Sequence, residues 1–158
     1  MSSGTIYNAN EVADWFITRL NTDAGDTMSP LKLQKLIYYA QAWHLTIFKQ
    51  PLFQEKIEAW VHGPAVATVY QRFKSTSKDA AIDWKVPVSN VEFPIETQHL
   101  LEEVYSIYGE HSAGFLEELT HSEPPWIKAR KGLDVYEKSN REITHESMIS
   151  YYSSINHD

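Results

Sequence analysis

An uninterrupted run of apolar and helix-forming residues follows Ser29-Pro30 and constrains the fold more than any other feature. Ser is a preferred helix N-cap, and Pro fits the first helical position, where its missing N–H costs nothing. Residues 31–45 contain neither Gly nor Pro, and their apolar side chains form two stripes at helical spacing. One stripe contains Leu33, Leu36, Ile37, Ala40, His44 and Ile47, and the other contains Leu31, Tyr38, Ala42 and Leu45. Because a helix that is apolar on two faces packs on more than one side, the sequence predicts a central helix.

The remaining apolar residues predict further helices around this central one. Helical spacing extends over about 8–20, 64–73, 94–108, 112–119 and 144–153. Asn8 or Asn10, Ser112 and Thr144 are preferred N-caps for three of these segments, and Gly109 ends another. The sequence therefore predicts a mainly α fold, a compact bundle of about six helices, with all 158 residues in one domain.

The predicted β content is at most a short two-stranded element. Residues 57–61 alternate in the manner of a strand, and 84–88 are a second candidate. After the sharp His62-Gly63 turn, Pro64 is expected to begin a helix. The inner face of that helix is expected to carry Val66, Val69, Tyr70 and Phe73.

The second half of the chain is expected to contain a loop at 120–126, because two consecutive prolines oppose a helix there. A short helical piece is expected at 127–131. The helices at 94–108 and 112–119 are expected to bury Ile95, Leu100, Leu101, Val104 and Ile107 or Tyr108, followed by Phe115, Leu116 and Leu119.

The absence of cysteine excludes a disulfide framework, a thiolate zinc site and a thiol nucleophile, and it is compatible with a reduced cytosol. No segment approaches the roughly 18–20 consecutive apolar residues of a membrane span. The first five residues lack the basic and apolar pattern of a secretory signal. We therefore expect a cytoplasmic protein that does not bind membranes.

Neither a metal site nor a cofactor is expected, because no two of the seven histidines have the short spacing of metal ligands. The chain has no Gly-x-Ser-x-Gly or His-Glu-x-x-His motif and no glycine-rich phosphate loop. His121 lies close in sequence to Glu117, Glu118 and Glu123, which leaves a small hydrolase as the weakest alternative. We expect no enzymatic activity.

The charges are unevenly distributed along this acidic chain, whose net charge is −7. Residues 86–127 contain eight Glu and no Lys or Arg, whereas 30–85 contain eight basic and four acidic residues. This separation fits either an acidic face and a basic patch or two solvated helix faces. It lacks the broad basic footprint of a nucleic-acid binder, so no direct binding of nucleic acid is expected. Lys32 and Lys35 begin the central helix, where the helix dipole disfavours cations unless an acidic neighbour or partner compensates them.

The residues Trp60, His62, Gly63 and Pro64 form the most unusual local cluster in the sequence. They fit a tight strand-to-helix connection with Trp60 packed in the core. They fit equally a rigid, partly exposed edge for protein recognition, because exposed Trp and Tyr are favoured interface anchors.

Several linked motifs surround this cluster. The central helix carries LQKLIYYAQAW at 33–43, and it is followed by PLF at 51–53, IEAWVHGPAV at 57–66 and then Tyr70 and Phe73. In this order the motifs resemble the core signature of the Panacea antitoxin domain, the SocA-like or phage-associated GepA-like domain. LTH at 119–121 and Trp126 resemble its second half, and the resemblance covers about residues 9–130. Ala65 stands where the family often has Val.

The resemblance implies a non-catalytic antitoxin of a bacterial or prophage toxin–antitoxin pair, which neutralises a cognate protein toxin by direct binding. Two alternatives are an adaptor that delivers its target to a AAA+ protease and a phage-encoded regulator that binds a host protein. The characteristic residues predict a contact surface at the start of the central helix and the turn: Lys32, Lys35, Tyr39, Gln41, Glu58, Trp60 and His62. Gly63 and Pro64 are expected to hold the turn. For Tyr39 and Trp60, the alternative to contact with a partner is a structural role in the fold.

Overall fold

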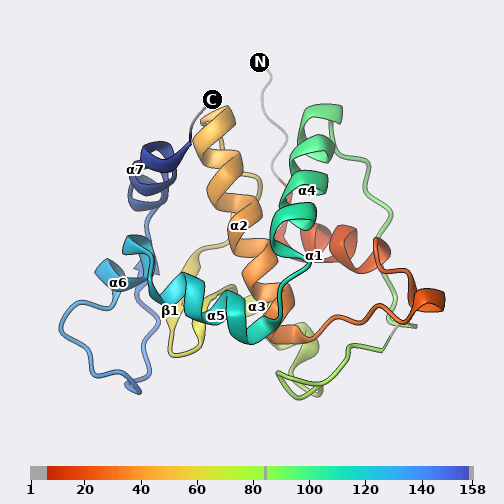
Figure 1. The fold of residues 1–158 in the computed structure, drawn as a ribbon, viewed down its shortest axis with the longest axis horizontal. Coiled ribbons are helices and arrows are strands. Elements are labelled where there is room, and N and C mark those ends of the chain that lie inside the picture. The colour runs from red at the N-terminus through yellow and green to blue at the C-terminus, as the bar shows by residue number, and fades with distance from the viewer. Residues whose placement is uncertain (1–6, 84, 157–158) are drawn as a thin grey trace.

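The computed structural model describes residues 7–83 and 85–156. Within these residues, seven α-helices, one 3-10 helix and a three-stranded sheet follow one another along the chain (Figure 1). The elements are α1 (Ala9–Thr18), η1 (Thr22–Ala24), α2 (Pro30–Phe48), β1 (Ile57–Trp60), β2 (Gly63–Ala65), α3 (Ala67–Phe73), α4 (Ile95–Tyr108), α5 (Ala113–His121), α6 (Pro124–Ala129), β3 (Glu142–Ile143) and α7 (His145–Ile155). The predicted mainly α fold with a short β element is confirmed.

Helix α2 runs through the middle of the molecule, with α7 on one side and α4 on the other (Figure 1). It also contacts α1, α5 and β2. Fourteen of its nineteen residues are buried, which confirms the predicted central helix. Ile47 departs from the predicted stripe, since it lies in the last turn of the helix and is 41% exposed.

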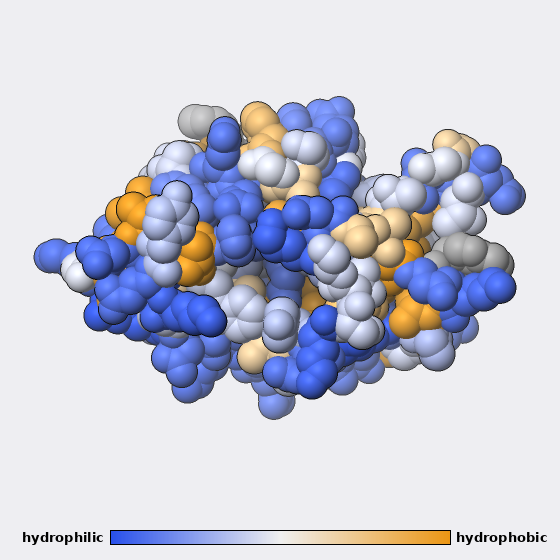
Figure 2. Space-filling model, turned by 90° about the horizontal axis from the view of Figure 1, so that it is seen from below, coloured by the Kyte–Doolittle hydropathy of each residue, from blue (hydrophilic) through white to orange (hydrophobic). Residues whose placement is uncertain are grey.

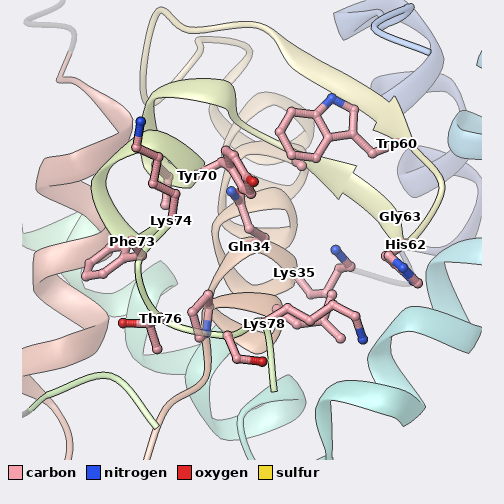
Figure 3. A pocket seen from close by; sticks show the side chains of 15 residues that line it. Gln34, Lys35, Trp60, His62, Gly63, Tyr70, Phe73, Lys74, Thr76 and Lys78 are labelled. Carbon is pink, nitrogen blue, oxygen red and sulfur yellow. The ribbon is translucent and has the colours of Figure 1, made fainter. Parts of the chain in front are cut away.

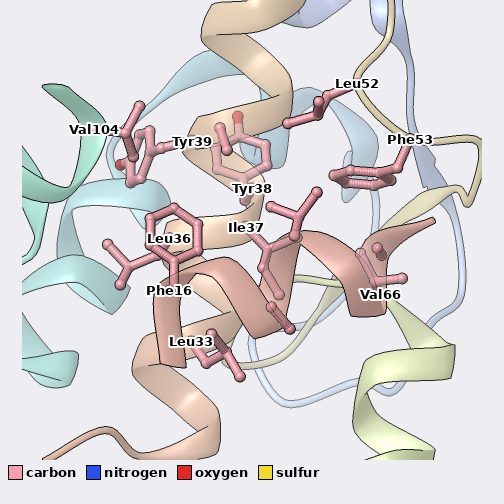
Figure 4. Packing of buried hydrophobic residues seen from close by; sticks show 14 of the residues in the cluster. Phe16, Leu33, Leu36, Ile37, Tyr38, Tyr39, Leu52, Phe53, Val66 and Val104 are labelled. Atoms are coloured by element: carbon pink, nitrogen blue, oxygen red, sulfur yellow. The ribbon is translucent and has the colours of Figure 1, made fainter. Parts of the chain in front are cut away.

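The hydrophobic core surrounds α2 on several sides (Figure 4). Phe16 reaches it from α1, Val104 from α4 and Phe53 from the loop before β1, and they pack around Leu36 and Ile37 of α2. Each such side chain, fully buried, stabilises the fold by about 1.5–3 kcal/mol relative to exposure. The core therefore depends on α2, since the other elements bury their apolar faces against it.

Side-chain caps fix the starts of the helices where the sequence predicted them. Asn8 and Glu11 form a reciprocal capping box at the start of α1. Ser29 accepts from the Lys32 amide at 3.2 Å, and Thr144 accepts from the Ser147 amide at 3.1 Å. Ser112 likewise caps α5, and Gly109 ends α4 as expected.

The β element differs from the prediction because Pro64 lies in a strand and does not begin a helix. Strand β2 pairs with β1 antiparallel, with Ala59 opposite Pro64 and Trp60 opposite Gly63. Pro is tolerated here because β2 is an edge strand, so its missing N–H interrupts no central ladder. Helix α3 begins only at Ala67.

The sheet has a third strand that the sequence pattern did not indicate. Strand β3 pairs with β1 antiparallel, with Ile57 opposite Ile143, and gives the order β2-β1-β3. A two-residue strand is too short for any periodicity to reveal. The other strand candidate is wrong over 85–88, which form no strand, and its first residue, Trp84, lies outside the described residues.

The predicted loop at 120–126 is also wrong. Helix α5 continues to His121, and α6 begins directly at Pro124. Both prolines occupy the first turn of α6, where their missing N–H groups would have no partner within the helix. The prolines therefore start a helix that they were expected to prevent.

Several apolar side chains that were predicted to face inward are exposed. Ile95 is 61%, Phe115 47% and Tyr70 49% exposed. Of the two alternatives at the end of α4, Tyr108 packs against the core, whereas Ile107 is 52% exposed. Each exposed side chain lies on a helix with one buried face, near an end or on the edge of its apolar stripe. Helical spacing identifies the face of a helix, but it does not show how far the neighbouring elements extend over it.

Candidate functional site

A pocket of about 360 Å³ opens between α2, the β1–β2 hairpin and α3 (Figure 3). We name it the Lys35 pocket and define it by Leu31, Gln34, Lys35, Trp60, Tyr70 and Phe73. Its lining is mainly apolar, and the side chains come from three separate elements of the fold. Its size is in the range of pockets that hold a small ligand or a few side chains of a partner.

Two buried glutamines on α2 bind the backbone of the segments before and after the β1–β2 hairpin. Gln34 binds both backbone groups of Val66, with Nε2 donating to the carbonyl at 3.0 Å and Oε1 accepting from the amide at 2.8 Å. Gln41, two turns later, accepts from the Leu52 amide at 2.7 Å and donates to the Phe53 carbonyl at 2.9 Å. Gln41 therefore fixes a buried loop, and it is 0% exposed, so it presents no surface to a partner.

The Lys35 side chain forms the inner end of the pocket. Only 1% exposed, it donates from Nζ to the Pro64 carbonyl at 3.1 Å. Burial lowers the pKa of Lys35 to about 7, although Glu117 acts in the opposite direction. A buried amine with a lowered pKa therefore forms part of the wall of a pocket.

Gly63 leaves the space that this amine needs. Its φ of +109° is a conformation that side-chain-bearing residues rarely adopt. A Cβ atom at Gly63 would lie 2.7 Å from Lys35 Cε and 2.9 Å from Thr120 Oγ1. Glycine is thus required for both the turn and the close approach, as the predicted structural role of Gly63 needs.

Lys32 points away from this pocket. Its Nζ donates to the Gly109 carbonyl at 2.6 Å, at the end of α4, where the carbonyl end of the helix dipole favours a cation. Burial lowers the pKa of Lys32, and Asp26 acts in the opposite direction. The compensation expected for this lysine is therefore provided within the fold by a neighbouring helix end.

Hydrogen bonds from α6 and from the residue after it hold the backbone of the hairpin that carries Trp60. Trp126 Nε1 donates to the Trp60 carbonyl at 2.8 Å, and Arg130 Nη1 donates to the Ala59 carbonyl at 2.8 Å. The Trp60 indole lies on the other side, half-buried, with Nε1 donating to Glu58 Oε1 at 2.8 Å. Trp60 is therefore held in a fixed position beside the pocket.

Exposed aromatic side chains gather around Trp60. The Trp60 and Tyr70 rings meet edge to face with centroids 5.4 Å apart. The same two residues also line a wider groove of about 820 Å³, together with Tyr136. Tyr136 is 84% and its neighbour Val135 71% exposed. We name Trp60, Tyr70 and Tyr136 the aromatic rim.

His62 lies on the surface beside this rim. Its Nδ1 is 3.0 Å from Glu117 Oε2, and this pair links the hairpin turn to α5. Lys35, Trp60, His62 and Gly63 line the same pocket, so the structure brings these four predicted residues together. Glu58 stands next to them through its hydrogen bond to Trp60.

Tyr39 lies in a different environment, a buried cluster that we name the Glu123 cluster. Tyr39 and Tyr152 both donate from their hydroxyls to Glu123 Oε1, at 2.9 and 2.8 Å. The Tyr39 ring stacks on Tyr108 with centroids 3.9 Å apart, and Tyr38 completes the cluster through a 3.0 Å contact with the Tyr152 hydroxyl. Burial raises the pKa of Glu123. Tyr39 is 0% exposed and thus belongs to the core, which is a correction to its place in the predicted contact surface.

The structure adds pocket residues that the sequence reasoning did not select. Gln34, Lys74 and Lys78 line the pocket beside Lys35, and Glu123 is the shared acceptor of the buried tyrosines. One sequence feature could have identified Gln34, since it is a polar residue within a run of positions predicted to be buried. Lys74 and Lys78 follow α3 and have no such feature, because only the fold brings them to the start of α2.

The imidazole that supported the hydrolase alternative is packed against an aromatic ring. His121 stacks on Trp126 with centroids 4.0 Å apart, and burial lowers its pKa. Among the described residues its Nε2 has no hydrogen-bond partner. Over the same residues, no group of three or more His, Asp or Glu is placed to hold a metal ion.

The face seen from below in Figure 2 is largely hydrophilic, and its hydrophobic surface is limited to separate patches. None of the helices within 7–83 and 85–156 combines the length and the apolar character needed to cross a bilayer. This face therefore offers a partner small apolar sites and no broad apolar surface.

Comparison with known proteins adds one finding to this geometry. The family model described as "Antitoxin SocA-like, Panacea domain" matches residues 33–127, from the first turn of α2 to α6. The chain belongs to this Panacea antitoxin family. No curated protein and no solved structure matches it. The matched region contains most of the residues that line the Lys35 pocket, including Lys35 and Trp60, and also Glu123 of this Panacea domain, and the match supports a role related to toxin–antitoxin systems.

Proposed function

We propose that this Panacea domain neutralises a cognate protein toxin by binding it directly in the cytoplasm, without a chemical step. The aromatic rim is the observation that carries the proposal. Trp60 is fixed by hydrogen bonds to its own backbone and indole, so its exposed part is presented rigidly. Rigid, half-exposed Trp and Tyr side chains lose little conformational entropy on association and are frequent binding hot spots.

The charge distribution supports the same proposal. The eight glutamates of residues 86–127 lie mainly on α4 and α5, while the Lys35 pocket carries lysines. A toxin with complementary charges would associate faster and in one orientation, because electrostatic complementarity mainly affects rate and specificity.

Co-expression with the product of the adjacent reading frame tests the proposal, with growth and co-purification scored together. We expect growth rescue and a stable complex at a fixed stoichiometry. Trp60→Ala should weaken the complex by at least about 30-fold, the effect of losing a hot spot of about 2 kcal/mol. The matched control is Ile107→Ala, which removes an apolar side chain that is 52% exposed on α4.

Three results would contradict direct neutralisation. Rescue far below a one-to-one ratio would indicate catalysis. Rescue with loss of the partner protein from the cell would indicate delivery to a AAA+ protease. A neighbouring product that is harmless by itself would favour a phage-encoded regulator that binds a host protein.

A further inference from the structure

The Lys35 pocket combines apolar walls with an excess of positive charge. Leu31, Val69, Tyr70 and Phe73 belong to its apolar lining. Among the described residues, the charged side chains that line it directly are three lysines, with no Asp or Glu, and Glu117 lies near Lys35 outside the lining. An apolar pocket of about 360 Å³ with only basic ionisable groups and one histidine selects a ligand that is apolar and anionic.

The Lys35 ammonium has unused hydrogen-bonding capacity. A protonated lysine has three N–H donors. In the part of the chain that the structure describes, Lys35 Nζ has a single hydrogen bond, to the Pro64 carbonyl, and no ion pair within 4 Å. The buried side chain lines the pocket, and Figure 3 shows Lys35, Trp60 and Tyr70 converging on it from α2, β1 and α3. A carboxylate inside the pocket would satisfy the ammonium.

Two further lysines line the pocket closer to solvent. Lys74 and Lys78 are both exposed, and Lys78 pairs with Asp79 at 3.0 Å on the surface. They extend the positive charge from the buried Lys35 out to the solvent. A partner segment that enters here passes Lys74 and the Lys78–Asp79 pair before it reaches Lys35, and these lysines favour acidic residues beside the inserted side chain.

We propose that the Lys35 pocket binds a segment of the toxin in which an apolar side chain adjoins an Asp or Glu. The apolar side chain packs between Tyr70 and Phe73, and the carboxylate pairs with Lys35. This inference rests on the proposed function and names the chemistry of the partner at one site. The aromatic rim lies at the mouth of the same pocket, since Trp60 and Tyr70 belong to both, so contacts at the rim and in the pocket form one surface.

The pairing makes binding dependent on pH. Charged and titratable groups near Lys35 come from each neighbouring element: Glu117 and His121 of α5, His62 of the hairpin turn, and Lys78 after α3. In the folded chain without a partner, the pKa of Lys35 is about 7, and a partner carboxylate beside the amine raises it. Affinity should therefore fall as pH rises above 7, by up to about 30-fold at pH 8.5.

The experiment measures the affinity of the purified toxin for the full chain at pH 6.5 and 8.5. Lys35→Met should weaken the complex by at least about 30-fold at pH 6.5 and remove most of the pH dependence. Because Lys35 is buried, the exposed pair Lys74→Glu and Lys78→Glu provides a second variant that leaves the core intact, and it should also weaken binding. Lys128→Glu is the matched control on the exposed side of α6.

A photo-crosslinking amino acid in place of Tyr70 identifies the bound segment. We expect the crosslinked toxin peptide to contain an apolar residue beside Asp or Glu. A crosslinked peptide without a carboxylate, or pocket variants that bind as tightly as the unchanged chain, would overturn this inference alone. Absence of any complex would contradict the proposed function and this inference together.

Other occupants of the pocket give distinct results, and each of them would also overturn the inference. A second copy of this chain would make the free protein a dimer that Lys35→Met dissociates. A small carboxylic acid would appear as a bound mass in native mass spectrometry of the purified chain and would be absent from Lys35→Met.

Discussion

Lys35 of α2 and Glu123, the residue before α6, are both buried ionisable groups, but their surroundings differ. Glu123, 6% exposed, accepts hydrogen bonds from two tyrosine hydroxyls at 2.8 and 2.9 Å within a closed aromatic cluster. Lys35, 1% exposed, lines a pocket, and within residues 7–83 and 85–156 it has one side-chain hydrogen bond, at 3.1 Å. Burial opposes the charged form of each, raising the pKa of Glu123 and lowering that of Lys35.

This comparison separates a group that supports the fold from a group that is available for binding. A buried acceptor with two donors contributes to stability, because its removal leaves both buried donors without a hydrogen-bond partner. A buried ammonium with one acceptor contributes little to the fold, since an apolar side chain of similar size in its place is often neutral or stabilising. The difference lies in the number of hydrogen-bond partners, because both groups are almost fully buried.

The largest expected effect follows from Glu123→Ala. The substitution leaves the Tyr39 and Tyr152 hydroxyls without their shared acceptor and opens a cavity between α2, α6 and α7. We expect the free energy of unfolding to fall by about 4 kcal/mol, measured by urea denaturation. Glu118→Ala on the exposed side of α5 is the control, with an expected change within about 0.5 kcal/mol. A loss as small as that of the control would show that the cluster does not stabilise the fold.

A smaller effect is expected from Gly63→Ala beside Lys35. The added Cβ meets Lys35 Cε and Thr120 Oγ1, and alanine is strained at this positive φ, so we expect a loss of about 3 kcal/mol. In a double-mutant cycle, Lys35→Ala should recover only the part due to the Lys35 contact. Full recovery would mean that backbone strain at Gly63 is negligible, and no recovery would mean that the amine does not pack against the turn.

The smallest expected effect is the change in the free energy of unfolding per pH unit. This change should have opposite signs for Glu123 and Lys35. Because the folded pKa of Glu123 is raised above 4.5, the folded state retains the proton longer, and stability falls as pH rises from about 4.5 to that folded value. Because the folded pKa of Lys35 is about 7 and the reference value 10.5, the unfolded state binds more protons between them. Stability should rise with pH in that window, by at most about 1.4 kcal/mol per unit.

Denaturation curves at pH 4 to 9.5 measure these slopes. Glu123→Gln should remove the first slope and Lys35→Met the second, each without affecting the other. An unchanged slope above pH 7 in Lys35→Met would assign that dependence to another group.

Much of the α-helical framework was predictable because its signals are local. Ser29, Ser112 and Thr144 cap their helices through side chains that reach an amide three residues on, so sequence spacing alone identifies them. The central position of α2 followed from its two apolar stripes. Pro124 misled the prediction, since proline either opposes or begins a helix and only its distance from the helix start decides which.

The candidate site was predictable only in part. Trp60, His62 and Gly63 lie next to each other in sequence, and they remain together at the pocket. Lys35 and Gln41 are both polar residues on the same apolar helix, but one faces a pocket and the other a buried loop. Helical spacing places both side chains on α2, but it carries no information about which segment passes in front of each.

The sequence by itself determined the central helix, the caps, the basic segment 30–85, the acidic segment 86–127 and the family signature, because these depend on residues near one another or on composition. Only the tertiary structure decided that Glu123 receives two tyrosine hydroxyls while, among the described residues, no carboxylate lies within ion-pair distance of Lys35. That distinction depends on contacts between residues 29 to 84 positions apart. The energy of a buried charge is fixed by what surrounds it in space, and such neighbours are set by packing.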